Sequence, residues 1–255
     1  MVKLKTEKIL DYAVVSYSLD KCLAVIGEWL EREDRARVFV CANPHSLVLA
    51  EKDPEFKAAI RTADLVTPDG AGIVLASRLL GGDIKGRVTG SDVFLGLSRK
   101  LNERGSRTYR YFFLGSTEEN LSAIRSRMAG DYPGIEIAGT YSPPFKTTFS
   151  EDDSRKMIEA VNQTEPDVLW VGMTAPKQEK WIYRHRDKLK VRFIGAVGAV
   201  FDFYTGNVKR SHPVFQQMGL EWLPRLIRDP RRLYERTLIS APKFLWRVLR
   251  QRMRG

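Results

Sequence analysis

Asp69 is a candidate general base. It lies between Pro68 and Gly70, directly after the apolar segment Ala63–Thr67, where the chain leaves a predicted strand. A carboxylate in this position can take the proton of a hydroxyl group. Asp is also a preferred residue at the start of a helix, and a helix is expected to begin near Gly70. Position alone leaves both interpretations open.

Four further charged side chains are candidates for binding a ligand. Arg87 can hold a phosphate or a carboxylate. Asp92 precedes the predicted helix Val93–Lys100, so it either caps that helix or lines a site. Glu179 and Asp202 each follow a predicted strand. Each of the two either complements a helix dipole or holds a sugar or ribose hydroxyl.

Metal and dinucleotide motifs are missing. The chain has three histidines, none in a His-x-x-x-His pattern, so a zinc hydrolase is not expected. The Asp-x-Asp pair that often holds a divalent metal in sugar-nucleotide enzymes is absent, and Asp152 and Asp153 mark a helix start. Gly70 and Gly72 would let a phosphate or sugar approach the backbone, but without a third glycine they form no dinucleotide fingerprint. We therefore expect no metal and no cofactor.

Short apolar runs alternate with segments that carry helix-start signals. The predicted strands are Arg37–Ala42, Ala63–Thr67, Tyr109–Leu114, Ile135–Gly139, Val168–Gly172 and Arg192–Val197. Ser116 with Glu119, and Ser150 with Asp153, have the spacing of capping boxes. Pro176 suits the first turn of a helix that runs to about Leu189. This alternation predicts an α/β fold with a Rossmann-like, mostly parallel sheet flanked by helices.

Polar and glycine-rich residues follow each predicted strand. Because parallel sheets bind ligands beyond the carboxyl ends of their strands, these residues are expected to converge on one edge. They are Asn43, then Asp69 and Gly70, then Gly115 and Ser116, then Tyr141, then the segment from Thr174 to Glu179, and finally Gly198 and Asp202. The pattern suits a nucleotide-sized ligand.

The composition is that of a globular protein in a reducing compartment. The chain has 255 residues, of which 43% are hydrophobic and 29% charged, so long-range disorder is not expected. Its two cysteines, Cys22 and Cys41, form no disulfide framework. There is no apolar stretch long enough to span a membrane, and Met1–Asp11 lacks a signal-peptide pattern. A cytoplasmic protein is expected.

The basic charge is concentrated in the C-terminal segment. Residues 209–255 hold twelve Lys/Arg and three Asp/Glu, a net charge of +9, whereas residues 1–208 carry a net charge of +2. The composition shifts near Thr205–Pro213. We therefore expect an α/β core over residues 1–208 and a basic helical appendage over residues 209–255. Nucleic acid, anionic lipid or a diphosphate group would suit this appendage, and a solvated helix without a partner is the alternative.

The last segment, Lys243–Arg254, predicts an amphipathic helix. Leu245, Leu249 and Met253 recur on one face, with Trp246 beside them, and arginines recur on another face. A basic amphipathic helix that carries Trp is typical of an anionic membrane surface. Its apolar face would equally pack on the core or on a second copy of the chain, so a homo-oligomer stays an alternative.

Six segments in order resemble the WecG/TagA/CpsF glycosyltransferases, glycosyltransferase family 26. They are Ala63–Gly70, Arg87–Asp92, Phe113–Ser116, Val171–Trp181, Gly195–Asp202 and the segment from Gly219 to Leu226. The resemblance covers roughly residues 40–236. It implies an inverting, metal-independent transfer of a hexose or N-acetylhexosamine-type sugar from a UDP-sugar to a lipid-diphosphate-linked sugar. That reaction would take place on the cytoplasmic face of the cell membrane, in the synthesis of bacterial surface polysaccharide or teichoic acid.

The resemblance also implies roles for residues of this chain. Asp69 would be the catalytic base, and the appendage would close over the site and reach the membrane. The expected substrate-binding residues are Asn43, Thr67, Gly70, Arg87, Gly90, Asp92, Gly115, Tyr141, Gln178, Glu179, Asp202, Arg225, Arg228 and Arg232. The family tends to have Thr two residues before the Asn, where this chain has Cys41, a poorer hydrogen-bond donor. Either Thr67 or Ser46 would compensate for that difference, or the acceptor would be held differently.

Three other classes of function have weaker support in the sequence. A nucleic-acid-binding protein is not expected, since the appendage pairs its charge with aliphatic residues and lacks a known binding motif. A nucleotide-dependent oxidoreductase lacks its glycine fingerprint. A membrane-associated nucleotide-binding scaffold without catalysis stays an alternative, in which the Asp69 carboxylate would be dispensable.

Overall fold

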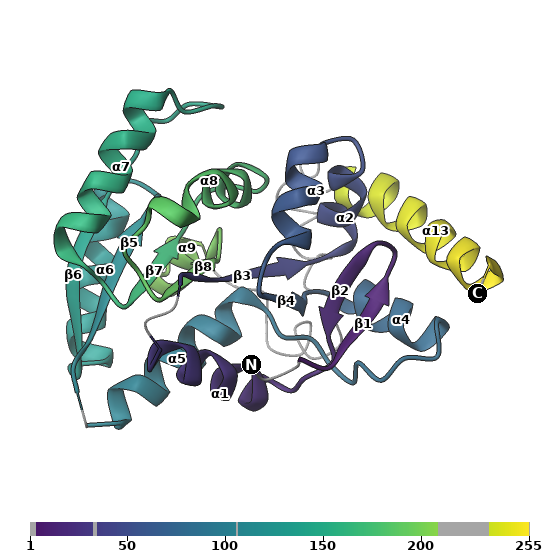
Figure 1. Ribbon diagram of the computed structural model, residues 1–255, viewed down its shortest axis with the longest axis horizontal. Helices are drawn as coiled ribbons and strands as arrows, with labels where there is room; N and C mark the ends of the chain where they lie inside the picture. The colour runs from purple at the N-terminus through teal and green to yellow at the C-terminus, as the bar shows by residue number, and fades with distance from the viewer. Residues whose placement is uncertain (1–3, 33–34, 106, 209–234, 255) are drawn as a thin grey trace.

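The computed structural model describes residues 4–32, 35–105, 107–208 and 235–254. A parallel six-stranded sheet with helices on both faces forms its centre (Figure 1). The strand order is β4-β3-β8-β7-β5-β6. The strands are β3 (Arg37–Ala42), β4 (Leu65–Pro68), β5 (Tyr109–Leu114), β6 (Ile135–Tyr141), β7 (Val168–Val171) and β8 (Phe193–Ala196). All six predicted strands are confirmed, although β6 runs two residues further than predicted.

Helices cover the sheet on two faces because side chains alternate along each strand. On β3, Val38 and Val40 belong to one apolar cluster and Phe39 belongs to the other. The first cluster also receives side chains from α2 (Pro44–Ala50), α3 (Pro54–Arg61), α4 (Ala71–Leu79), α7 (Glu151–Thr164) and α8 (Lys177–His185). The second receives side chains from α1 (Leu19–Leu30), α5 (Gly90–Glu103), α6 (Glu118–Asp131) and α9 (Val200–Thr205).

An N-terminal hairpin was not predicted from the sequence. β1 (Thr6–Ile9) and β2 (Tyr12–Val15) form a separate antiparallel pair, joined through Leu10 and Asp11. Leu10 adopts a left-handed backbone angle (φ 54°), which favours Asn or Gly. The strands are four residues long and β1 is largely polar, so neither the turn nor the strand signal was strong.

Several predicted helix starts are shifted. The Ser116–Glu119 capping box is wrong: Thr117 caps α6 by accepting a hydrogen bond from the Asn120 amide, because the Ser116 backbone is left-handed (φ 69°). Pro176 stands immediately before α8, which ends at His185 and not at Leu189. A 3₁₀ turn, η1 (Arg186–Lys188), follows it.

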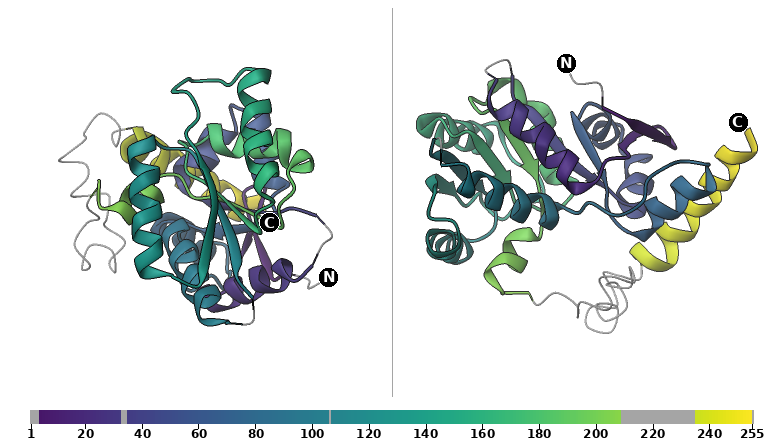
Figure 2. Two further views of the ribbon diagram at one scale, coloured as in Figure 1. Left: turned by 90° about the vertical axis from the view of Figure 1, so that its left-hand side faces the viewer. Right: turned by 90° about the horizontal axis from the view of Figure 1, so that it is seen from below.

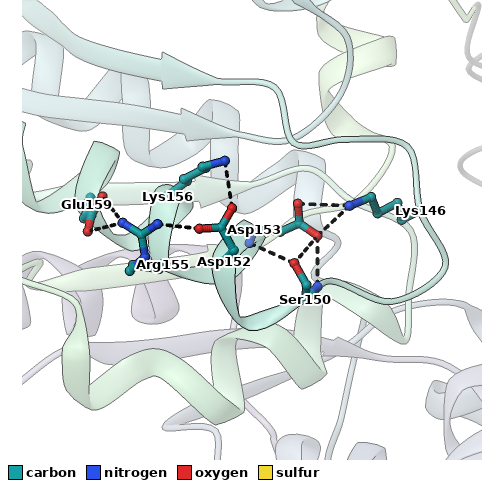
Figure 3. Close-up of polar contacts among 7 residues, drawn as sticks. All are labelled: Lys146, Ser150, Asp152, Asp153, Arg155, Lys156 and Glu159. Carbon is teal, nitrogen blue, oxygen red and sulfur yellow. Dashed lines mark hydrogen bonds and ion pairs between the residues drawn. The ribbon is translucent and has the colours of Figure 1, made fainter.

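The predicted capping box at the start of α7 is confirmed. The Ser150 hydroxyl accepts from the Asp153 amide, and the Asp153 carboxylate accepts from the Ser150 amide at 2.9 Å. Figure 3 shows Lys146 directed at the same carboxylate, which it contacts at 2.9 Å. Asp152 instead pairs with Arg155 and with Lys156. Both acidic residues thus serve the helix start, as predicted.

The chain ends in a helix that packs on the core. After η2 (Glu235–Ser240), helix α13 (Ala241–Arg254) lies beside α2 and α4, at the end of the molecule opposite β6 (Figures 1 and 2). Phe244 and Val248 are fully buried against the core. Part of the apolar face of α13 therefore packs on the core, which is the alternative to a purely interfacial helix. The residues 209–234 lie outside the described part of the chain.

The close packing of Trp170 against β8 gives a test of the core. Trp170 is fully buried, and a Cβ atom on Gly195 would lie 2.3 Å from its ring. We expect Gly195→Ala to lower the free energy of unfolding by about 1–3 kcal/mol, through overpacking. Gly130→Ala, at an exposed position of α6 with no atom within 4 Å of the added Cβ, should raise it by about 0.5–1 kcal/mol. Urea unfolding measures both, and equal effects would contradict this account of the core.

Candidate functional site

The carboxyl edge of the sheet is where the candidate residues meet. Helices α2 and α8, which follow β3 and β7, pack on one face of the sheet. Helices α6 and α9, which follow β5 and β8, pack on the other. Connections that leave neighbouring strands in opposite directions mark the position at which open parallel sheets bind ligands.

Asp69 lies at the end of β4 and does not cap a helix. Its amide donates to the Ala42 carbonyl at 2.8 Å, which fixes the turn after β4 against the end of β3. Gly70, in a left-handed conformation (φ 98°), occupies the cap position of α4 and provides no side-chain hydrogen bond. The capping interpretation of Asp69 is therefore wrong, and the half-buried carboxylate remains the candidate base.

Backbone contacts bring Arg87 and Asn43 to the same corner. The Val88 amide donates to the Pro68 carbonyl at 2.9 Å, so the segment that carries Arg87 runs beside the end of β4. On the other side, a Cβ atom on Gly72 would lie 2.5 Å from the Pro44 ring, so the Asn43–Pro44 turn packs against the start of α4.

Asn43 is committed to a capping box. Its side-chain oxygen accepts from the Ser46 amide at 2.9 Å, and the Asn43 amide donates to the Ser46 hydroxyl at 3.0 Å. Ser46 therefore does not take the place of the family Thr at position 41. Thr67 lies there instead, with its hydroxyl 3.6 Å from the Cys41 sulfur.

Helix α5 begins at the same edge. Thr89, and not Asp92, is its cap: the Asp92 carboxylate accepts from the Thr89 amide at 2.9 Å and from its hydroxyl at 2.8 Å. The expectation that Asp92 caps a helix beginning at Val93 is wrong, because the helix already starts at Gly90. A Cβ atom on Gly90 would lie 3.6 Å from the Val197 backbone, so this helix start adjoins the end of β8.

Gln178 and Glu179 join the ends of β7 and β8. The Gln178 carbonyl oxygen accepts from the amides of Met173 (3.3 Å) and Gly198 (3.0 Å), and its amide nitrogen donates to Glu179 Oε1 at 2.8 Å. Both side chains are buried. Burial raises the pKa of the Glu179 carboxyl to about 7.

Three carboxyl groups act on the Cys41 thiol at the end of β3. Burial raises the pKa of the thiol well above its ordinary value, and the charges of Asp69, Glu179 and Asp92 raise it further. Asp69 after β4, Glu179 in the first turn of α8 and Asp92 in the first turn of α5 are thus all near enough to the end of β3 to act on this thiol. A raised pKa leaves less of the thiol in its nucleophilic, ionised form.

A second group of predicted residues lies at the ends of β5, β6 and β8. The Gly115 amide donates to the Tyr141 carbonyl at 2.9 Å. Asp202 accepts from the Asn120 amide nitrogen at 2.9 Å, and that nitrogen also donates to the Ser116 hydroxyl at 2.7 Å. Gly115 thus bonds to Tyr141, and the next residue, Ser116, is linked to Asp202 through one nitrogen of Asn120.

No role for Asn120 was predicted from the sequence. It is 2% exposed and uses its oxygen as well, accepting from Thr205 (2.7 Å) and Asn207 (3.0 Å). Its only signal in the sequence is a polar residue on the inward side of α6, three residues after the helix cap. Arg225, Arg228 and Arg232 lie outside the described residues, so their expected contact with a diphosphate stays a prediction.

Among the described residues, no three His, Cys, Asp or Glu side chains are grouped so that they could hold a metal ion. Within the same residues, no helix has both the length and the apolar character needed to cross a membrane. The expectation that the reaction needs no metal ion stays a prediction.

An α/β sheet with these polar residues at its carboxyl edge is typical of enzymes that bind nucleotides. The sequence profile of the Glycosyl transferase WecG/TagA/CpsF family matches residues 7–255, and the chain belongs to that family. The predicted resemblance and the predicted class of enzyme are thereby confirmed.

Three similar proteins share one name. A Bacillus spizizenii protein named N-acetylglucosaminyldiphosphoundecaprenol N-acetyl-beta-D-mannosaminyltransferase is 32% identical over 218 residues, which cover 86% of this chain and 80% of that protein. A Bacillus subtilis protein of the same name is 28% identical over 97% of this chain and 93% of its own length. A Staphylococcus aureus protein of that name is 26% identical over 82% of this chain and 78% of its own length.

The Asn120 network gives a testable expectation. Asn120→Ala leaves the Asp202 carboxylate, the Thr205 hydroxyl and the Asn207 amide without their shared partner, so the free energy of unfolding should fall by about 1–3 kcal/mol. Asn162→Ala, which removes two hydrogen bonds to backbone at the surface, is the matched control and should cost less. Guanidinium unfolding measures the free energy of unfolding of both variants. A larger loss of stability in the Asn162→Ala variant would refute the role of Asn120.

Proposed function

We propose that this chain transfers N-acetylmannosamine from UDP-N-acetylmannosamine to a polyprenyl-diphosphate-linked N-acetylglucosamine. The observation that carries the proposal is the shared name of the relatives, one of which aligns with 97% of the chain. The transferred sugar and the acceptor are those that this name prints. The polar residues at the carboxyl edge of the sheet, where parallel α/β folds bind nucleotides, support a UDP-sugar as the donor.

Asp69 is the proposed base of an inverting single displacement. The acceptor hydroxyl oxygen forms a bond to the anomeric carbon of the donor sugar. The bond from that carbon to the diphosphate oxygen breaks, and UDP leaves with the electron pair. Asp69 takes the hydroxyl proton. Its place at the end of β4, one residue before the cap position of α4 that Gly70 occupies, supports this assignment.

The departing diphosphate needs positive charge or N–H groups, and two helix starts supply them. α4 and α8 begin at the carboxyl edge without a side-chain cap, so N–H groups of their first turns can bind a ligand, apart from those of Ile73 and Lys177, which donate to the Gly70 and Thr174 carbonyls. Arg87 lies beside the end of β4 and adds a guanidinium group. In this proposal these groups do the work of a metal ion, so the transfer is metal-independent.

The exposed side chains of the C-terminal helix support the proposal that the protein binds peripherally to the inner face of the membrane. Trp246, Leu249 and Met253 are 59%, 47% and 79% exposed and recur at i, i+3 and i+7 on α13. The Arg250 guanidinium lies over the Trp246 ring at 5.5 Å. An exposed apolar stripe with arginine beside it suits an anionic bilayer surface. The same helix packs on α2 and α4, which begin next to the candidate site.

The division at residue 208 and the closure of the site by the appendage belong to this proposal. Arg225, Arg228 and Arg232 would then contact a diphosphate group when the chain lies on the membrane. Such closure would exclude water from the donor and limit its hydrolysis.

The proposed reaction predicts acceptor-dependent release of UDP. With UDP-N-acetylmannosamine and a lipid-diphosphate-linked N-acetylglucosamine, the wild type should release UDP, and other UDP-sugars should serve poorly. Asp69→Asn should lower kcat roughly 10²- to 10⁴-fold, because the acceptor proton then has no base. Asp187→Asn, which removes a 97%-exposed carboxylate, is the matched control and should leave kcat unchanged.

Other outcomes point to other functions. Equal kcat of the Asp69→Asn variant and the wild type would exclude the proposed base. Absence of UDP release by the wild type with every donor and acceptor would favour a binding scaffold. Binding of RNA or DNA that weakens steeply with salt, with no UDP release, would favour a nucleic-acid-binding protein.

The exposed stripe on α13 predicts binding to anionic vesicles. Changing Trp246, Leu249 and Met253 together to Ser should weaken binding to phosphatidylglycerol vesicles at least tenfold, since three exposed apolar side chains lose their burial in the interface. Tyr183→Ser removes an aromatic side chain that is 39% exposed on α8 and should have no effect. Cosedimentation measures both, and unchanged binding of the triple variant would place the membrane contact elsewhere.

A further inference from the structure

Glu179 has one oxygen atom that the fold leaves without a partner. The side chain is 7% exposed, at the third position of α8. Its Oε1 accepts from the Gln178 amide nitrogen at 2.8 Å. Its Oε2 is buried and has no hydrogen-bond partner among the described residues. Buried polar atoms are rarely left in this state, so the atom points to a ligand.

The hydrogen bonds around Gln178 decide which oxygen can carry a proton. The Gln178 carbonyl accepts from two backbone amides, Met173 and Gly198, and this fixes the orientation of its amide group. The NH₂ group must therefore face Glu179 Oε1, which can only accept. A proton on this carboxyl group consequently sits on Oε2.

No positive side chain on α8 or α3 balances a charge on Glu179. Lys180 and Arg184 turn toward α3, where Lys180 contacts Asp53 at 2.8 Å and both contact Glu55. Lys177 donates to the Lys146 carbonyl at 2.9 Å, away from Glu179.

On the sheet side, Asp69 and Asp92 act, together with Glu179, on the Cys41 thiol at the end of β3, and Arg87 lies beside the end of β4. A buried carboxylate whose one side-chain hydrogen bond comes from a neutral amide is costly, and the group takes up a proton instead. Burial accordingly raises the pKa of Glu179 to about 7.

We propose that Glu179 binds the nucleotide-sugar donor as a neutral carboxylic acid, donating a hydrogen bond from Oε2 to an oxygen of the diphosphate. The proposal rests on the function proposed above and assigns Glu179 a chemical state and a partner. The start of α8 has no side-chain cap and attracts an anion. An ionised carboxylate in its first turn would repel that anion, whereas the neutral acid adds a donor to it. Asp69 and Glu179 then form a pair of carboxyl groups with opposite protonation states.

The protonation state can be tested without a substrate. An infrared difference spectrum of the wild type minus Glu179→Gln should contain the carbonyl band of a protonated carboxyl group at pH 6. That band should disappear with a midpoint near pH 7, because the group is protonated below its pKa and ionised above it. A band of ionised carboxylate alone at pH 6 would overturn the proposal.

Binding of UDP-N-acetylmannosamine, measured by calorimetry without acceptor, tests the partner. The wild type should bind roughly thirtyfold more weakly at pH 8.5 than at pH 6, since only the neutral form binds well. Glu179→Gln keeps an acceptor for Gln178 and an N–H donor in place of the proton. It should bind within threefold of the wild type at pH 6 and lose the pH dependence. Glu179→Met, of similar volume but without either group, should bind at least tenfold more weakly at pH 6.

Matched controls separate the possible failures. Glu118→Gln removes an exposed carboxylate from the first turn of α6 and should keep the wild-type pH dependence.

Loss of affinity in Glu179→Gln equal to that in Glu179→Met would overturn the proposal. The same pH dependence of binding in Glu179→Gln and in the wild type would overturn it too. UDP shares the diphosphate, so a gain from Glu179 seen with the UDP-sugar but not with UDP would overturn the diphosphate assignment. If the wild type binds no UDP-sugar at pH 6 although the infrared band is present, the proposed function fails and the neutral acid stands.

Discussion

The site depends on hydrogen bonds that continue the sheet one step beyond its strands. The Asp69 amide bonds to the carbonyl of Ala42 at the end of β3, and the Val88 amide bonds to that of Pro68 at the end of β4. The same step joins the turn after β7 to β5 and the turn after β8 to β7. Each loop therefore leaves the sheet from a position that its neighbour fixes. Polar groups far apart in sequence come together for this reason, and their backbone atoms stay satisfied near the core.

The sequence predicted the sheet well, because strands that are covered on both faces must be apolar throughout. Trp170 and its neighbours in β7 leave no other interpretation. The hairpin of β1 and β2 escaped prediction for the opposite reason: it is short, one strand is polar, and Leu10 stands where a turn residue would be expected.

Local spacing predicted some helix starts and not others. At Ser150 the predicted box is correct, although Thr148 and Glu151 have the same spacing. At Ser116 and Thr117, two hydroxyls stand side by side. The contact of Ser116 with Asn120, itself tied to Asp202, decides which one caps α6. Such a choice is made by tertiary contacts and is not written in local spacing.

The C-terminal helix shows the same limit on a larger scale. Its sequence has more apolar residues than one face can hold, so periodicity reveals an amphipathic helix without revealing which side meets the protein. The fold decides this by burying Phe244 and Val248 against α2 and α4. Trp246, Leu249 and Met253 remain at the surface. One helix can thereby hold the core on one side and a membrane on the other.

Carboxyl groups at the edge of the sheet show why residue type alone does not assign a role. Asp69 is half-buried at the end of β4, and Gly70, not Asp69, occupies the cap position of α4. Glu179 is buried, and its neighbour Gln178 is locked by the backbone of two strand ends. In the sequence both are acidic residues that follow an apolar strand. Only the packing of α8 against the sheet removes water from Glu179, and this burial raises the pKa of its carboxyl group. An acid and a base can thus arise from the same functional group, provided that the fold buries one and leaves the other partly in solvent.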